Sequence, residues 1–306
     1  MQHLLRRQVL KRIHFSGQSL KLFNFGKPAL INRYTVIGNP IAHSVSPDIH
    51  HVFGELSQRR IQYSRTEATP ENFADVVRDW KEQGGLGCNV TMPFKSQAMQ
   101  VVDRIKPSAR RAGALNTVFM HKDGSLVGHN TDGSGLLADL CNTLQFDPNE
   151  RRVLMIGAGG ASRGVLGPLL DRQPSTLVIA NRTLTRAQEL AEQFAADGAV
   201  TAVAIEELAN QPPFDLVLNA TSSGLTGEQL ALPNGLFAKN ALAYDMVYSN
   251  TDTPFMAWAR TNGAAKVIDG FGMLVEQAAD AFLIWQGIRP KTRLVYPRLS
   301  HLRQAD

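Results

Sequence analysis

The chain has 306 residues, of which 43% are apolar and 19% are charged, so it can bury a large core and is long enough for about two domains. No apolar run reaches the length of about 20 residues that a membrane-spanning helix needs, and no signal peptide with a small-residue cleavage site is evident. The two cysteines, Cys88 and Cys141, lie far apart and fit neither a disulfide framework nor a paired-ligand metal motif, which favours core positions for both and a reducing, cytoplasmic location.

The start of the chain holds much of the positive charge. Residues 1–33 carry seven Lys or Arg and no Asp or Glu, so the rest has 25 basic and 27 acidic residues, a net charge of −2 against +5 for the whole chain. This balance argues against nucleic-acid binding by the folded part. We interpret residues 1–33 as a disordered tail or the result of an upstream translation start; an organellar transit peptide, or a basic arm on nucleic acid or membrane, is the alternative.

From Tyr34 on, short apolar runs alternate with amphipathic segments, which is typical of a parallel α/β sheet. Ser46-Pro47 and Thr69-Pro70 are expected to start helices, because serine is a good N-cap and proline suits the first helical position. The predicted strands are 34–37, 61–66, 86–90 and 115–121. The predicted helices are 47–57, 70–83, 94–102, 107–112 and about 133–143.

After the polar boundary stretch QFDPNERR, the pattern changes to that of a dinucleotide-binding domain. The stretch RRVLMIGAGGASRGVLGPLL reads as a strand, a glycine turn and a helix, and STLVIANRTLTRAQELAEQF gives a second strand and helix. Two more strands follow in FDLVLNATSSG and ALAYDMVY. The final segment GFGMLVEQAADAFLIWQG is apolar on most faces of a helix, so we expect it to be buried and to pack on the first domain.

The glycine turn and the end of the next strand carry the cofactor signal. In Gly157-Ala158-Gly159-Gly160-Ala161-Ser162, the glycines permit a tight turn and close approach of a pyrophosphate, although the third motif position is serine. The following strand ends in Asn181-Arg182-Thr183, with Arg186 one helical turn on, where an NAD enzyme usually has an acid. Two guanidinium groups and a hydroxyl suit a ribose 2′-phosphate, and ordinary surface arginines are the alternative.

The loop GNPIAHSVSP, residues 38–47, is a candidate anion site. Ser46 has a structural explanation as a helix cap, but Ser44 and His43 do not, and a helix N-terminus with free amides and hydroxyls can hold an anion. The loop is therefore a candidate for binding a substrate carboxylate.

Two further stretches carry chemistry. In GCNVTMPFK, the polar Asn89 and Thr91 at a strand end lead to Lys95, a candidate proton donor, with a flexible surface lysine as the alternative. In GALNTVF and GHNTDGSG, Asn116 lies on a strand and Asp132 starts a helix, where it would also make a good N-cap. No metal site is expected, because the histidines lack ligand spacing and the adjacent His50 and His51 cannot both face one metal.

Taken together, the motifs resemble shikimate dehydrogenase of the plain NADP-dependent kind over roughly residues 34–290. They are GNPIAHSVSP, NVTMPFK, GALNTV, NTDG, GAGGASRG, NRT, NATSSG, YDMVY and GMLVEQAA, in this order. The resemblance implies reversible reduction of 3-dehydroshikimate to shikimate by NADPH, an oxidoreductase step in the pathway to chorismate and the aromatic amino acids. Hydride arriving at a ketone leaves an oxyanion that must receive a proton, and a lysine close to an aspartate can supply it.

The resemblance also assigns roles to residues. Lys95 and Asp132 match the catalytic pair, and Ser44 and Ser46 match the serines that hold the substrate carboxylate, with Tyr248 near it. The residues that match those lining the ring hydroxyls are Asn89, Thr91, Asn116 and Gln277. The residues expected to bind NADP(H) are Gly157, Ala158, Gly159, Gly160, Ala161, Asn181, Arg182, Thr183, Arg186, Met246 and Gly270.

The implied organisation is a two-domain α/β protein with a Rossmann-like doubly wound dinucleotide-binding domain. After the tail, 1–33, we expect an α/β substrate domain over 34–132, completed by the C-terminal helix region 270–306, and an NADP-binding domain over 133–269. The expected partner is a small molecule, not nucleic acid or a membrane, and the chain is expected to be a monomer or a homodimer. A quinate/shikimate dehydrogenase with relaxed cofactor choice would show an acid where Arg182 stands, and a non-catalytic dinucleotide-sensing regulator would not need both Lys95 and Asp132.

Overall fold

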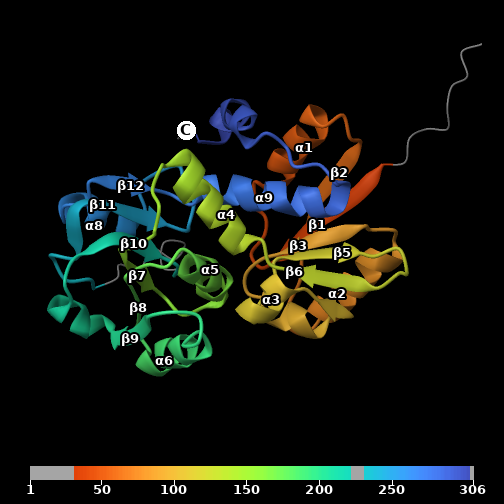
Figure 1. Ribbon diagram of the computed structural model, residues 1–306. Helices are drawn as coiled ribbons and strands as arrows, with labels where there is room; N and C mark the ends of the chain where they lie inside the picture. Colours follow the sequence, from red (N-terminus) through yellow and green to blue (C-terminus); the bar gives the residue numbers. More distant parts are fainter. Residues whose placement is uncertain (1–30, 222–230, 304–306) are drawn as a thin grey trace, which may run out of the picture. The chain divides into compact units, whose positions relative to one another are not determined.

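The computed structural model describes residues 31–221 and 231–303, whose strands form two six-stranded sheets (Figure 1). The two sheets belong to one unit of the chain that begins at Ile31. The predicted tail lies outside the described residues except for residues 31–33. Of the motif NATSSG, only Asn219, Ala220 and Thr221 are described.

The first sheet has the strand order β2-β1-β3-β5-β6-β4. Its strands are β1 (Asn32–Gly38), β2 (Ile61–Glu67), β3 (Gly87–Val90), β4 (Arg104–Ile105), β5 (Thr117–Met120) and β6 (Leu126–His129). The helices of this part are α1 (Ser46–Leu56), α2 (Phe73–Glu82), the 3₁₀ helix η1 (Gln97–Gln100) and α3 (Pro107–Ala112).

The first sheet is mixed, which corrects the prediction of a parallel sheet. β1 pairs in parallel with β2 and β3, but β5 runs antiparallel to both β3 and β6. The cause is the short connection after β5, where His121 N donates to Ser125 O over 2.8 Å and Gly124 has φ +82°. So short a connection can join only antiparallel strands.

The second sheet is parallel throughout, with the order β12-β11-β10-β7-β8-β9. Read from β9, this is the doubly wound order of dinucleotide-binding folds, so the predicted fold class is confirmed. Its strands are β7 (Arg152–Ile156), β8 (Thr176–Asn181), β9 (Val200–Ala204), β10 (Phe214–Asn219), β11 (Phe237–Asp245) and β12 (Lys266–Ile268). The other elements are α4 (Asp132–Ala138), the π-helix η2 (Asp139–Thr143), α5 (Gly160–Asp171), α6 (Leu184–Gln193), η3 (Ile205–Asn210), α8 (Pro254–Thr261), α9 (Phe271–Gln286), η4 (Thr292–Leu294) and η5 (Tyr296–Arg303).

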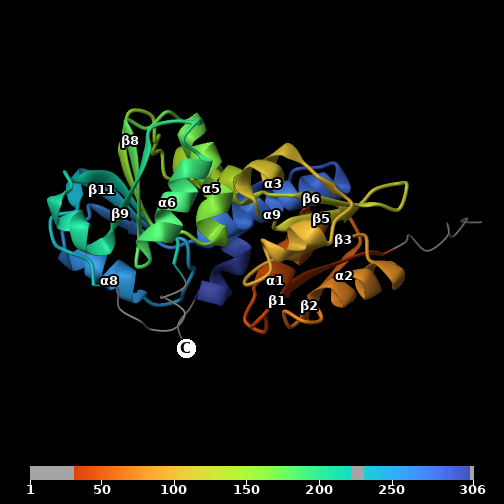
Figure 2. The same ribbon diagram turned by 90° about the horizontal axis from the view of Figure 1, so that it is seen from below.

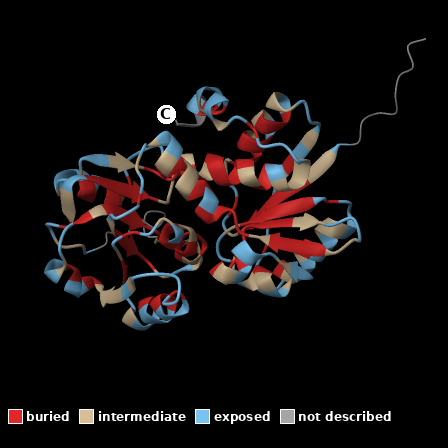
Figure 3. Ribbon diagram, viewed as in Figure 1, coloured by how far each residue is buried: buried red, intermediate tan, exposed pale blue. Residues whose placement is uncertain are grey.

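Alternating strand residues of the second sheet feed two separate apolar cores. Val153 and Met155 of β7 pack with residues of α5 and α6, whereas Leu154 and Ile156 pack with residues of α8 on the other face. This alternation follows from the two-residue repeat of a strand. Figure 3 shows the central strands of both sheets as largely buried, whereas β2, β4, β9 and β12 are mostly intermediate or exposed.

Several elements differ from the predicted bounds for local reasons. β1 begins at Asn32, two residues before the predicted strand, because its first residues pair with Ile61 and Gln62. The helix predicted from 70 begins at Phe73, since Asn72 Oδ1 accepts the amide of Thr69 over 2.7 Å and closes a turn there. The helix predicted over 94–102 is only the 3₁₀ helix η1, and the helix after Asp132 becomes π-helical from Asp139 to Thr143.

The C-terminal helix α9 lies beside α4 and reaches α1 (Figure 1). Phe271, Val275 and Phe282 of α9 share an apolar cluster with Ile49 and Phe53 of α1. The contact with α4 is close, because a Cβ on Gly135 would lie 2.6 Å from the Cβ of Gln277. Only a glycine allows the two helices to approach this far.

A second tie between the two sheets joins α3 to α5, which lie side by side in Figure 2. The guanidinium of Arg111 pairs with Asp171 at the end of α5 over 2.8 Å and with Asp197 over 3.1 Å.

Within the described ranges, no helix is both long and apolar enough to span a bilayer.

The cysteines bear out their assignment to the core only in part. Cys88 on β3 is 1% exposed, and burial raises the pKa of its thiol to about 12. Cys141 in η2 is only half-buried. Both are free thiols.

His50 is a fully buried histidine in the aromatic layer beneath α1. Its ring stacks on Tyr63 with centroids 4.2 Å apart and meets the edge of Phe53 at 5.7 Å. Neither ring nitrogen has a hydrogen-bond partner among the described residues. Burial, followed by the neighbouring charge of His51, lowers the pKa of His50 from 6.5 to about 3. The imidazole is therefore neutral in the folded protein at physiological pH.

This histidine makes stability depend on pH. The unfolded chain binds a proton to His50 below about pH 6.5 and the folded chain does not until about pH 3, so stability is complete above pH 6.5 and declines as the pH falls between these values. We expect the unfolding free energy of wild type to fall relative to that of His50→Phe by about 1.4 kcal/mol per pH unit in this window. Urea unfolding of both proteins between pH 7 and pH 4 measures it, and parallel pH profiles would contradict it.

Candidate active site

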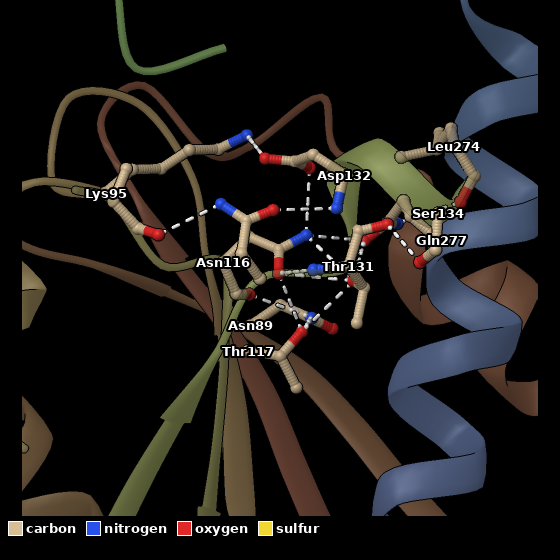
Figure 4. Close-up of polar contacts among 11 residues, drawn as sticks. Asn89, Lys95, Asn116, Thr117, Thr131, Asp132, Ser134, Leu274 and Gln277 are labelled. Carbon is tan, nitrogen blue, oxygen red and sulfur yellow. Dashed lines mark hydrogen bonds and ion pairs between the residues drawn. The ribbon is translucent and has the colours of Figure 1, made fainter. Parts of the chain in front are cut away.

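The ion pair between Lys95 and Asp132 is the centre of the candidate site (Figure 4). Lys95 Nζ donates to Asp132 Oδ2 over 2.7 Å, and the two side chains are only 18% and 5% exposed. The backbone at Lys95 is fixed on both sides: Phe94 is buried against Phe73, and Lys95 O accepts the amide of Leu115 over 2.8 Å. The structure thus brings together two residues that are far apart in the chain.

Asp132 is not the N-cap that the sequence suggested. Thr131 occupies the N-cap position of α4 and Asp132 is the first helical residue. The side chain of Asn130 accepts the Asp132 amide over 2.9 Å, which satisfies the backbone without the Asp132 carboxylate. Because the carboxylate has no capping role, both of its oxygens face other side chains: Oδ2 meets Lys95 and Oδ1 accepts from Asn116 Nδ2 over 2.8 Å.

Asn116, just before β5, links the ion pair to α9. Its Nδ2 also donates to Thr131 Oγ1 over 2.9 Å and to Gln277 Oε1 over 3.1 Å. Its Oδ1 accepts from the amide of Thr131 and the hydroxyl of Thr117, each over 2.9 Å. Gln277 is held in turn by its own Nε2, which donates to Leu274 O over 2.8 Å. Figure 4 shows this network running from Lys95 to α9.

Asn89 and Thr91, at the end of β3, lie next to this network. Asn89 Nδ2 donates to Asn116 O and to Thr117 Oγ1, each over 3.0 Å, and Asn89 Oδ1 accepts from Tyr63 OH over 2.7 Å. Thr91 follows the strand and lies against Gly38, where a Cβ would come within 2.4 Å of the Thr91 methyl group. Gly38 therefore permits the close approach of the end of β1 to Thr91.

The loop before α1 arranges its two serines differently from the predicted cap. The helix starts at Ser46, Val45 occupies the N-cap position, and no side chain caps it there. Ser44 Oγ accepts the amide of Ser46 over 3.3 Å, so Ser44 has the local turn contact that the sequence assigned to Ser46. Tyr248, from the segment after β11, donates to His43 O over 3.3 Å and so reaches the same loop.

The glycine turn after β7 faces the ion pair from the second sheet. Gly157 has φ +107°, a conformation that favours glycine, and a Cβ on Gly159 would meet nothing within 4 Å. Ser162, at the third motif position, is buried and donates to Gly157 O over 2.8 Å, which closes the turn and explains the serine. A Cβ on Gly160, the first residue of α5, would lie 3.6 Å from the Cβ of Lys95. The stem of Lys95 is therefore next to the turn.

The segment after β8 presents two cations. Arg182 and Arg186 are exposed, and neither has a carboxylate partner among the described residues. Asn181 Nδ2 donates to Thr183 O over 2.9 Å and holds the turn into α6. Because both guanidinium groups lie at the N-terminal end of α6, the helix dipole disfavours them unless an anion is bound there.

Met246 and Gly270 lie in contact at the carboxyl end of the second sheet. A Cβ on Gly270 would lie 2.3 Å from Met246 O, and Gly270 N donates to Val247 O over 3.1 Å. All residues predicted to bind the cofactor thus lie at the carboxyl ends of these strands or at the start of the next helix. This is where such folds bind ligands.

Asp245 is a residue that the sequence analysis missed. It is fully buried, and its carboxylate accepts from Asn219 Nδ2, from Thr253 Oγ1 and from the amide of Val247. Burial raises its pKa, and these hydrogen bonds oppose the rise. Asp245 thus fixes the ends of β10, which is next to β7, and of β11. The only sequence signal was its place inside the motif YDMVY.

Two parts of the chain match models of known protein families. Residues 36–118 match the family model described as shikimate dehydrogenase substrate binding domain, and residues 140–226 match the one described as shikimate / quinate 5-dehydrogenase. Within the described residues, no group of three or more His, Cys, Asp or Glu side chains is placed to hold a metal ion.

Individual proteins match over nearly their whole length. The shikimate dehydrogenase (NADP(+)) of Aeromonas hydrophila is 50% identical over 270 residues, which cover 88% of this chain and 98% of that protein. The crystal structure of an Ael1 enzyme from Pseudomonas putida aligns with a TM-score of 0.81 at 42% identity and covers 88% of this chain and 98% of that one. The shikimate 5-dehydrogenase of Thermus thermophilus, solved with NADP(H) and shikimate, aligns with a TM-score of 0.78 at 32% identity and covers 89% and 99%. By this similarity the chain belongs to the shikimate dehydrogenase family.

Proposed function

We propose that the protein catalyses the reversible NADPH-dependent reduction of 3-dehydroshikimate to shikimate, a step toward chorismate and the aromatic amino acids. The observation that carries this proposal is the position of the Lys95–Asp132 pair. The two side chains form an ion pair of 2.7 Å, and the stem of Lys95 lies beside Gly160 in the glycine turn. A proton donor thus lies next to the place where a nicotinamide cofactor is expected to bind.

The residues of the glycine turn fit a dinucleotide. Gly157 holds the left-handed backbone of the turn, Gly159 leaves open space, and the N-terminus of α5 begins at Gly160. The helix amides and dipole there favour a pyrophosphate. Bound NADPH would supply the hydride for reduction, and Met246 and Gly270 would line the cofactor near the carboxyl ends of β11 and β12.

The chain's own residues handle the proton. A lysine ammonium carries more than one N–H group, and only the bond to Asp132 is formed by Lys95 Nζ within the described residues. Its remaining N–H groups can donate to the substrate ketone oxygen and deliver a proton as charge develops there. Asp132, held by Asn116, keeps the ammonium in position and takes part in the return of the proton when shikimate is oxidised.

The substrate would bind between this pair and the loop before α1. Asn116, Gln277, Asn89 and Thr91 supply hydroxyl and amide groups for the ring hydroxyls. Ser44 and Ser46, with Tyr248, are assigned to the carboxylate, because Tyr248 reaches the serine loop through His43 O. We accordingly assign residues 34–132 with 270–306 to substrate binding and 133–269 to NADP binding.

Arg182, Arg186 and Thr183 are assigned to the ribose 2′-phosphate, together with Asn181. Both guanidinium groups lack a carboxylate partner in the described part of the chain, and both lie at a helix N-terminus, where a bound phosphate would offset their unfavourable position. A preference for NADP follows.

The cytoplasm remains the predicted compartment, and a monomer or homodimer remains the predicted assembly. The free thiols of Cys88 and Cys141 support a reducing compartment.

Nicotinamide absorbance tests the function directly. Purified protein is mixed with shikimate or quinate, each with NADP and with NAD. We expect rapid reduction of NADP with shikimate and much slower reaction in the other combinations. Comparable rates with quinate would support the quinate/shikimate alternative, and tight NADP binding without turnover would support a non-catalytic sensor.

The catalytic pair predicts a large loss of turnover. Lys95→Ala or Asp132→Asn should lower kcat by roughly 100-fold or more, the usual scale for loss of a positioned acid–base group, with a smaller change in KM for shikimate. Steady-state kinetics measure both parameters, and Lys81→Ala, a half-buried lysine in the last turn of α2, serves as the control. Near-normal kcat in Lys95→Ala would remove this lysine from the chemistry.

The arginine pair predicts a selective loss of NADP. Each charge-assisted contact to phosphate contributes about 1.5–3 kcal/mol, so replacing both Arg182 and Arg186 by Ala should raise KM for NADP roughly 100-fold or more and leave KM for NAD nearly unchanged. Arg172→Ala, an exposed arginine at the far end of α5, is the control. Equal rises for both cofactors would instead indicate a general defect of the nucleotide site.

A further inference from the structure

The serine loop before α1 is held by a charged side chain to which the sequence gave no role. Arg65 lies on β2, where Tyr63, two residues earlier, lies on the same face of the sheet and donates to Asn89. The Nε of Arg65 donates to Ser44 O over 2.7 Å. The hydroxyl of Ser44 is assigned to the substrate carboxylate, and Asn89 is assigned to the ring hydroxyls. Through Arg65 and Tyr63, β2 therefore contacts residues at both ends of the proposed substrate site.

Several N–H groups of the Arg65 guanidinium have no acceptor among the described residues. Its one ion pair within the described residues, from Nη2 to Asp48 Oδ2, is long at 3.4 Å, and the two side chains are 38% and 39% exposed. An arginine carries several N–H groups, and the others have no acceptor in the part of the chain that the structure describes. The guanidinium therefore holds the loop through Nε, and its two terminal nitrogens have N–H groups available for a ligand.

The positive charge of Arg65 also acts on Tyr248, which contacts the same loop. Burial raises the pKa of the Tyr248 phenol, and the charge of Arg65 opposes that rise while Asp48 adds to it. Tyr248 and Arg65 each bind a carbonyl of the loop, His43 O and Ser44 O. The loop is thus held by both a phenol and a guanidinium.

We infer that Arg65 is a specificity residue for the substrate carboxylate: it positions Ser44 and supplies the positive charge that favours an acid over a neutral analogue at this end of the site. The inference rests on the proposed function and deepens it. Serine and tyrosine hydroxyls bind neutral and charged groups alike, whereas a guanidinium distinguishes a carboxylate from an ester. Asp48 competes with the carboxylate for Arg65 and moderates the effect.

Kinetics with shikimate and with its uncharged methyl ester test this role. We expect Arg65→Gln to raise KM for shikimate roughly tenfold, the lower end for loss of a hydrogen bond to a charged group, with kcat and the KM for the ester changed by less than about threefold. Arg65→Lys, which keeps the charge, should recover part of the loss. Asp48→Asn should act in the opposite direction and lower KM for shikimate by about two- to threefold, the scale of an exposed ion pair.

The controls separate structure from specificity. Arg104→Gln removes a similarly exposed ion pair, with Asp123, at the opposite edge of the same sheet and should leave both substrates unaffected. Equal losses on acid and ester in Arg65→Gln, or a higher KM for shikimate in Asp48→Asn, would show that Arg65 only anchors the loop. Absence of shikimate oxidation by the wild type would contradict the proposed function itself, whereas an active wild type with unchanged KM in Arg65→Gln would contradict this inference alone.

Discussion

The burial of the Asp132 carboxylate is the constraint on which the site depends. A carboxylate with a side chain only 5% exposed must be paired and hydrogen-bonded, or its burial would cost several kcal/mol. Lys95 supplies the charge and Asn116 the hydrogen bond, and both lie on connections next to strands of the first sheet, while Asp132 begins the helix that leads to the second. The proposed catalytic pair therefore also fixes the junction of the two sheets.

Close backbone approaches make this junction possible. Gly135 lets α4 contact α9 at Gln277, and a Cβ on Gly164 of α5 would lie 3.0 Å from Asp132 Oδ2. α4 thus packs closely on α9 at Gly135, and α5 approaches the Asp132 carboxylate directly at Gly164. Gln277 then joins the polar network through Asn116, so α9 ties the end of the chain to the ion pair. The same packing places Lys95 beside the glycine turn.

Features that depend on a local pattern or an ordered motif could be predicted from the sequence. The glycine turn after β7, the residues Lys95 and Asp132, and the fold class all follow from short stretches with a clear physical reading. Local patterns could not reveal which of two candidate groups makes a contact. Ser44 rather than Ser46 accepts an amide at the start of α1, and Asn130 rather than Asp132 satisfies the start of α4, because the backbone geometry of each turn decides the partner.

Residues that act across the chain were the hardest to predict. Asp245 joins Asn219 and Thr253, and Arg65 reaches Ser44, through contacts between strands and loops that no single stretch shows. The antiparallel β5 was missed although the connection after it contains Asp123-Gly124, a pair that is typical of β-hairpins. Such contacts become visible only when the sheet order and the register are known.

The central claim is that the Lys95–Asp132 pair holds the reacting oxygen of the substrate beside the nicotinamide. A crystal structure of the ternary complex with NADP and shikimate tests it most directly. The account predicts one shikimate hydroxyl within hydrogen-bonding distance, roughly 3 Å, of both Lys95 Nζ and the Asp132 carboxylate, with the substrate carboxylate at the serine loop. A complex in which the substrate carboxylate faces Lys95, or in which the ring lies away from the glycine turn, would contradict it.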